Sequence, residues 1–92
     1  MTEIEKPIKF SRHALENLFN RGASREEAEQ AIRTGERLPA KKGRIAFRKI
    51  FSHNALWKGK FYQAKQVIPI VVEEPDRFVV VTAYVFFIGG VR

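Results

Sequence analysis

The sequence predicts an α+β domain in which a short N-terminal strand and an αα-hairpin pack on one face of a curled antiparallel sheet of three to four strands. Residues 11–35 contain two short segments that start with helix-capping residues and end at glycines. From residue 44 to residue 88 the apolar side chains recur with a period of two, which is typical of strands. With 92 residues the chain is long enough for one two-layer core, so residues 1–92 are expected to form a single domain.

The helical hairpin, over residues 11–35, is predicted from its boundary residues. Ser11 is a good N-cap for the first helix, which ends at Gly22. Ser24 caps the second helix, with Glu27 completing a capping box, and this helix ends at Gly35. The expected buried face of the first helix consists of Ala14, Leu15, Leu18 and Phe19.

The sheet is expected over residues 44–88, after a first short strand at residues 8–10. Ser52–Ala55 is predicted to be a turn, and Pro69 to mark an edge strand or a bulge. On the first long strand, one side should carry Ile45, Phe47 and Phe51, and the other Arg44, Ala46, Arg48 and Ile50. On the last strand, the side buried against the helices should carry Val79, Val81, Ala83, Val85 and Phe87, and the open side Phe78, Val80, Thr82, Tyr84 and Phe86.

The composition excludes several classes of protein. There is no cysteine and there are only two histidines, without a cluster of carboxylates, so we expect neither a disulfide framework nor a metal site, and no cofactor. The longest apolar runs, Val79–Val81 and Val85–Ile88, are too short to cross a membrane. The first ten residues lack the layout of a secretory signal, so a cytoplasmic location is expected.

The positive charge is concentrated in the middle of the chain. The formal net charge is +7, and residues 37–65 contain nine Lys or Arg residues and no acidic residue. Aromatic residues are interleaved with these cations, a combination that suits RNA because phosphates attract cations and aromatic rings stack on unpaired bases. The expected RNA-binding residues are Arg44, Lys41, Lys42, Lys49, Lys58, Lys60, Lys65 and Trp57. The alternative is a solvated surface that only keeps the protein soluble.

His13 is the first candidate for chemistry. It falls at the second position of the first helix, where unpaired backbone N–H groups favour an anion, and it lies away from the apolar stripe. A histidine there can transfer a proton near a phosphate; the alternative is an ordinary surface histidine. His53, in the expected turn, is interpreted as a surface residue.

The predicted sheet supplies cations and hydroxyl groups on its open side. Arg44 and Arg48 could contact one phosphodiester there, or could be solvated side chains that cover the sheet. Thr82 and Tyr84 offer hydroxyls that can donate to a phosphate, although such residues are often half-buried packing. Together with His13 these groups match metal-independent RNA cleavage, which needs a proton acceptor, a proton donor and cations.

Three segments resemble a prokaryotic, phage-associated family of toxin-like domains of unknown function. They are Ile8-Lys9-Phe10-Ser11-Arg12-His13-Ala14, Arg21-Gly22-Ala23-Ser24-Arg25-Glu26-Glu27 and Val79-Val80-Val81-Thr82-Ala83-Tyr84. That family is grouped by remote similarity with the RelE/ParE-type toxins and with colicin-like and EndoU-like ribonucleases. The resemblance implies a RelE/ParE-like fold, cleavage of messenger or transfer RNA without metal, on the ribosome in some cases, and neutralisation by a small acidic antitoxin.

The resemblance also implies site residues. His13 matches the helix histidine, Arg48 and Arg44 match the cations of the central strand, and Thr82 and Tyr84 match the polar pair of the last strand. The leading interpretation is therefore a metal-independent endoribonuclease whose catalytic residues are His13, Arg48, Tyr84 and Thr82. The alternatives are a non-catalytic RNA-binding module and a protein-interaction module.

Overall fold

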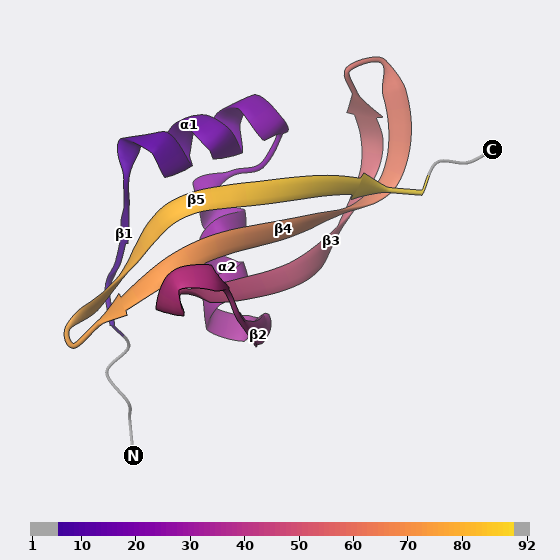
Figure 1. Cartoon of the computed structure of the whole chain (residues 1–92). Coiled ribbons are helices and arrows are strands. Elements are labelled where there is room, and N and C mark those ends of the chain that lie inside the picture. Colours follow the sequence, from indigo (N-terminus) through magenta and orange to yellow (C-terminus); the bar gives the residue numbers. More distant parts are fainter. Residues whose placement is uncertain (1–5, 90–92) are drawn as a thin grey trace.

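The computed structural model describes residues 6–89, in which two helices pack on a five-stranded sheet that does not close into a barrel (Figure 1). The helices are α1 (Arg12–Arg21) and α2 (Arg25–Thr34). The strands are β1 (Ile8–Phe10), β2 (Glu36–Pro39), β3 (Ile45–Trp57), β4 (Lys60–Glu74) and β5 (Arg77–Ile88), with a short 3₁₀ turn, η1 (Lys41–Gly43), between β2 and β3. The α+β class and the helical hairpin are confirmed, whereas the predicted strand number of three to four is too low.

The sheet has the spatial order β1-β5-β4-β3-β2. β1 pairs with β5 in parallel, and the other neighbouring strands pair antiparallel. The strand missing from the prediction is β2, which follows Gly35 at once and pairs with the start of β3. Its four residues include two charged ones and a proline, so it carries no apolar periodicity that could have revealed it.

The helix boundaries are confirmed. The Ser11 hydroxyl accepts from the Ala14 N–H, and Gly22 ends α1 in the left-handed conformation. The Ser24–Glu27 capping box is complete. These caps satisfy backbone groups that the helices themselves leave unpaired.

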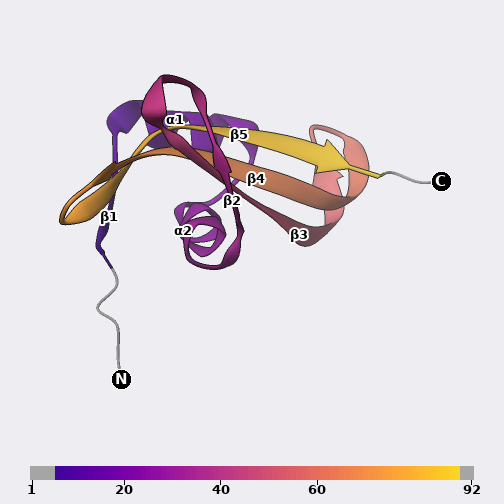
Figure 2. The same ribbon diagram turned by 60° about the horizontal axis from the view of Figure 1, so that its bottom comes forward.

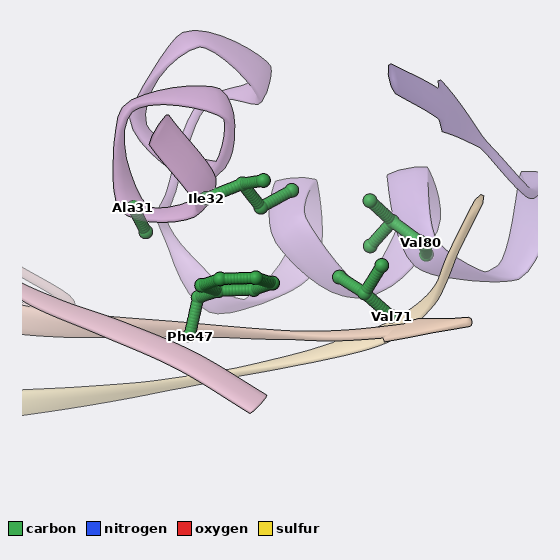
Figure 3. Packing of buried hydrophobic residues seen from close by; sticks show 6 residues of the cluster. Ala31, Ile32, Phe47, Val71 and Val80 are labelled. Carbon is green, nitrogen blue, oxygen red and sulfur yellow. The ribbon is translucent and has the colours of Figure 1, made fainter. Parts of the chain in front are cut away.

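A single layer of side chains joins both helices to the sheet (Figure 3). Ala31 and Ile32 of α2 pack above Phe47, while Ala14 of α1 belongs to the same cluster as Val71 and Val80. A second cluster joins Leu18, Ala28, Val67 and Ala83. Both α-helices therefore cover one face of the sheet, and the connection between β2 and β3, which contains η1, lies on the opposite side from α2 (Figure 2).

The buried face of α1 is narrower than predicted. Ala14 and Leu18 are buried, but Leu15 is half-exposed and Phe19 is 81% exposed, so the prediction that these two belong to the core is wrong. The reason is the position of α1, which packs mainly on β5 and meets the sheet along one line of side chains. Only residues on that line lose their contact with water.

Because β5 contains a bulge, the faces predicted for the last strand are wrong on the N-terminal side of that bulge. Ile70 pairs with Thr82 but Val71 pairs with Val80, so Val81 is an extra residue. Upstream of it Val80 faces the helices and Phe78 packs on the same cluster, contrary to the prediction, which placed Val79 and Val81 there. Downstream of the bulge the prediction holds, because Ala83 is in the core and Thr82 and Tyr84 line the open face. A regular period of two cannot reveal an inserted residue.

Two other expectations concern a turn and a proline in the strands, and the first of them is wrong. Ser52–Ala55 is not a reversal but part of β3, with a register shift where Asn54 takes a positive φ of 47°. The chain reverses at Lys58 and Gly59, whose positive φ values suit a two-residue hairpin turn. Of the two alternatives predicted for Pro69, the edge strand is wrong, because β4 is the central strand, whereas a bulge is present beside it, opposite the step from Ile70 to Val71.

The far ends of β3 and β4 form an arm that packs back on the helix corner. Phe87 stacks on Trp57 at 5.3 Å between ring centroids and also contacts His53 and Tyr62. His53 is therefore half-buried against Phe87, not at the surface as expected. The backbone of Gly22 lies against the Phe87 and Trp57 rings, which closes the arm onto the helical hairpin.

Glu73, near the end of β4, connects both edges of the sheet. Its carboxylate accepts from Lys6, just before β1, at 2.8 Å and from Arg37 of β2 at 3.0 Å. The hydrogen bond from Lys6, followed by that from Arg37, holds the pKa of Glu73 below its usual value. In the adjoining turn the hydrogen bond to Glu74 raises the pKa of Arg77.

Candidate nucleic-acid interface

A basic loop closes over the uncovered face of the sheet. The Ala40 N–H donates to the Arg44 carbonyl at 2.9 Å, and the Arg44 N–H donates to the Lys41 carbonyl at 3.2 Å. Lys42 and Gly43 take positive φ values of 62° and 71°, which turn the chain back within this short segment. The loop therefore holds two exposed lysines and the half-buried Arg44 beside the sheet.

Between this loop and β5 lies a cleft of about 460 Å³, which we name the open-face cleft. Its lining residues are Ala40, Lys41, Lys42, Arg44, Ile70, Thr82 and Tyr84. Three of them are cations and none is acidic, so the cleft is suited to an anion. The hydroxyls of Thr82 and Tyr84 come from the opposite wall, on β5.

Asn17 of α1 connects the cleft to His13. Its Nδ2 donates to the Thr82 hydroxyl at 2.7 Å and lies 3.1 Å from His13 Nε2. An amide nitrogen can only donate, so this contact is a hydrogen bond in the tautomer of His13 that carries its proton on Nδ1 and leaves Nε2 as the acceptor. The Thr82 oxygen also accepts, which leaves the Thr82 O–H free to donate to a bound group.

Arg21, one helical turn after Asn17 in α1, contacts the next two residues of β5. It donates to the Ala83 carbonyl at 2.7 Å, and its guanidinium carbon lies 5.4 Å from the centre of the Tyr84 ring. Arg21 therefore fixes the strand and the ring that presents the Tyr84 hydroxyl.

Arg48 does not line the open-face cleft. It donates to Glu36 of β2 at 2.7 Å and lines a separate hollow with Glu36, Lys49, Ile50 and Gln66. Of the four predicted catalytic residues, the structure thus brings together Thr82, Tyr84 and, through Asn17, His13. Arg44, predicted as an RNA contact, takes the position beside Thr82 and Tyr84.

The remaining predicted RNA contacts are spread over the molecule. Lys41 and Lys42 line the cleft, and Lys49 lies in the hollow beside Arg48. Lys58 and Lys60 are exposed at the tip of the arm, where Trp57 is stacked on Phe87. Lys65 requires a correction: it is buried, donates to the Gly22 carbonyl at 2.8 Å and pairs with Glu27 at 2.9 Å, so it is a structural cation.

Asn17 and Arg21 are site residues that the sequence analysis missed. His13, Asn17 and Arg21 follow one another at intervals of four residues, which places them on one side of a helix. That spacing was available in the sequence. The sequence does not show that this side of α1 lies directly beside Thr82 and Ala83 of β5.

Two other kinds of feature are absent from residues 6–89. No group of three or more His, Cys, Asp or Glu residues in that range is arranged to hold a metal ion. Neither of the two helices described is long and apolar enough to cross a membrane.

These features define a two-layer α+β domain with a basic cleft on the uncovered face of its sheet. Residues 10–85 match the sequence profile of a family described as a domain of unknown function (DUF4258), and the chain belongs to this family. No curated protein and no solved structure matched the chain.

Proposed function

We propose that this domain binds RNA in the open-face cleft and cleaves it by attack of a ribose 2′-hydroxyl on the adjacent phosphorus. The observation that supports the proposal is the convergence of Lys41, Lys42 and Arg44 with the hydroxyls of Thr82 and Tyr84, beside the linked His13. A phosphodiester needs cations around its oxygens, and its cleavage needs groups that accept and donate a proton. The cleft provides the cations and the hydroxyl groups, and His13 is linked to it through Asn17.

The reaction follows from these groups. The 2′-oxygen forms a bond to phosphorus, the bond from phosphorus to the 5′-oxygen breaks, and the products are a 2′,3′-cyclic phosphate and a 5′-hydroxyl. His13 Nε2 accepts the proton of the 2′-hydroxyl once RNA displaces the amide of Asn17, and Tyr84 donates a proton to the leaving oxygen. Arg44 and the Thr82 hydroxyl stabilise the charge that develops on the phosphoryl oxygens.

The finer assignments rest on the resemblance described above and are proposals as well. They are kinship with RelE/ParE-type toxins, messenger or transfer RNA as the substrate, action on the ribosome, and a small acidic antitoxin as partner. The concentration of positive charge in residues 37–65 fits both an RNA and an acidic protein.

The experiment is incubation of the purified protein with RNA in EDTA, with and without ribosomes, followed by analysis of the cleaved ends. We expect 2′,3′-cyclic phosphate ends, and a loss of rate of about 10²-fold or more for His13→Ala, Tyr84→Phe and Arg44→Ala. Arg48→Ala is the matched control, because Arg48 is paired with Glu36 outside the cleft, and it should lose much less. Intact RNA under all these conditions, with folded protein, would refute the cleavage mechanism.

A second candidate function is RNA binding without cleavage. It is favoured by the spread of cations beyond the cleft, since Arg44 also lines an adjoining hollow of about 530 Å³ together with Arg37. This function predicts that the logarithm of the affinity falls linearly with the logarithm of the salt concentration. Lys42→Ala should reduce that slope by about one unit, without any cleaved product in the wild-type reaction.

A further inference from the structure

β5 has an outer edge that is only partly used within residues 6–89. β1 pairs with it at Phe78, Val79 and Val80 and then ends, as Figure 1 shows. Side chains of α1 reach the next part of the strand, where Asn17 contacts the Thr82 hydroxyl and Arg21 the Ala83 carbonyl. From Tyr84 to Ile88 no described strand pairs with this edge.

The unpaired segment has none of the features that normally protect a sheet edge. Natural proteins place charges, prolines or bulges on exposed edge strands, because such strands otherwise pair with other chains. Residues 78–89 contain no charged residue and no proline, and Tyr84–Ile88 consists of aromatic and β-branched residues, which favour strands. The opposite edge is protected by Glu36, Arg37 and Pro39 in β2.

The side chains beside this edge are exposed apolar groups. Tyr84 is 45%, Phe86 53% and Ile88 40% exposed, and they alternate along one side of β5. Phe86 takes part in none of the ring contacts found among the described aromatic residues. This edge is therefore suited to pairing with another strand that carries apolar side chains on the same face.

We propose that the edge of β5 at Tyr84–Ile88 pairs antiparallel with the same edge of a second copy of this chain. A twofold axis through Phe86 places Phe86 opposite its own copy and Tyr84 opposite Ile88 of the other copy. Each exposed side chain then gains a cross-strand neighbour. Pairing of β5 with the β2 edge of a second copy is disfavoured by the charges and the proline of β2.

The edge itself carries no charge that would oppose this pairing, because Tyr84–Ile88 contains no charged residue, while Lys41, Lys42 and Arg44 face Tyr84 across the open-face cleft. The pairing joins the two sheets into one, with both open-face clefts on the same side and the two Tyr84 residues about 14 Å apart along the strands.

The test is the mass of the full chain in solution, measured by light scattering or sedimentation over a range of concentrations. We expect twice the 10.6 kDa of one chain. Phe86→Lys places a charge opposite its own copy and should weaken dimerisation about tenfold or more. Phe61→Lys is the matched control, since Phe61 is also an exposed aromatic but lies on the arm, and it should remain dimeric.

A second variant tests the register directly. The chain has no cysteine, so Phe86→Cys introduces a single thiol, which should form a covalent dimer under mild oxidation. Phe61→Cys should not. A wild-type mass of one chain at all concentrations, or a dimer that Phe86→Lys leaves unchanged, would overturn the proposal, and neither result depends on whether RNA is cleaved.

Discussion

Asn17 is the residue on which the geometry of the proposed site depends. Its single amide group contacts both His13 and Thr82, and it thereby fixes a ring on the helix relative to a hydroxyl on the sheet. Asn17 is a positioning residue, because it acts through these two neighbours. The sequence alone shows only an asparagine on a polar helix surface.

The first prediction concerns this link. Asn17→Ala should lower the rate of RNA cleavage about tenfold, because Thr82 loses the group that orients its hydroxyl and His13 loses the contact that holds it beside the cleft until RNA binds, with a loss of stability of only about 1 kcal/mol. NMR of the His13 ring should show the Nδ1–H tautomer in the wild type and a mixture in the variant. Asn20→Ala, an exposed change on the same helix, should alter neither measurement. An unchanged tautomer in Asn17→Ala would contradict the assigned role.

Lys65 shows how the fold uses a cation that the sequence could not distinguish from its neighbours. Its ammonium is held by the Gly22 carbonyl and by Glu27, whose carboxylate also completes the cap of α2. We predict that Lys65→Met lowers the free energy of unfolding by about 2 kcal/mol, because it removes the side-chain donor of the Gly22 carbonyl and the cation paired with Glu27. Urea unfolding measures this loss. Lys60→Met, at an exposed position, is the control and should lose almost nothing.

At the scale of elements, the bulge in β5 and the corner at Gly22 set the positions of the functional side chains. The inserted Val81 shifts the alternation of β5, so that Thr82 and Tyr84 share the open face while Val80 stays in the core. The corner at Gly22 brings the helical hairpin against the arm. A β5 strand of the same length without the bulge would place different side chains on the open face.

The corner yields a prediction with an internal control. Gly22 and Gly59 have similar positive φ values of 85° and 82°, but a Cβ at Gly22 would lie 2.9 Å from the Phe87 ring, whereas nothing lies within 4 Å at Gly59. Gly59→Ala should therefore cost about 1 kcal/mol, for the backbone alone. Gly22→Ala should cost at least about 2 kcal/mol, a fall in Tm of roughly 10 °C. Equal losses of stability in the two variants would show that the contact between residue 22 and Phe87 is not tight.

At the scale of the whole molecule, Glu73 connects the segments at the two edges of the sheet through Lys6 and Arg37. Its pKa is lowered in the folded protein, chiefly by the hydrogen bond from Lys6. A carboxyl group with a lowered pKa stabilises the fold above its unfolded-state pKa, and this stabilisation is lost as the pH falls through the folded-state pKa.

The pH dependence of stability tests this connection. Wild type should be more stable than Glu73→Gln near neutral pH, and the difference should vanish as the pH falls into the acid range below the usual pKa of a glutamate. Thermal unfolding of both proteins from about pH 7 to about pH 2 measures the effect. Glu26→Gln, on the exposed side of α2, is the control. A difference that persists at low pH would mean that the ion pairs are not its cause.

Local sequence patterns predicted the helical hairpin, its caps, the α+β class and the alternation of β3, because caps and periodicity depend on residues close together in the chain. They also singled out His13, Thr82 and Tyr84. Three facts are visible only in the folded chain: Arg44 and not Arg48 lines the cleft, Asn17 joins His13 to Thr82, and Lys65 is buried. These facts depend on β2 with its Glu36, on one inserted residue in β5 and on the line along which α1 meets the sheet. Each of them is a contact between segments far apart in the sequence, which no local pattern encodes.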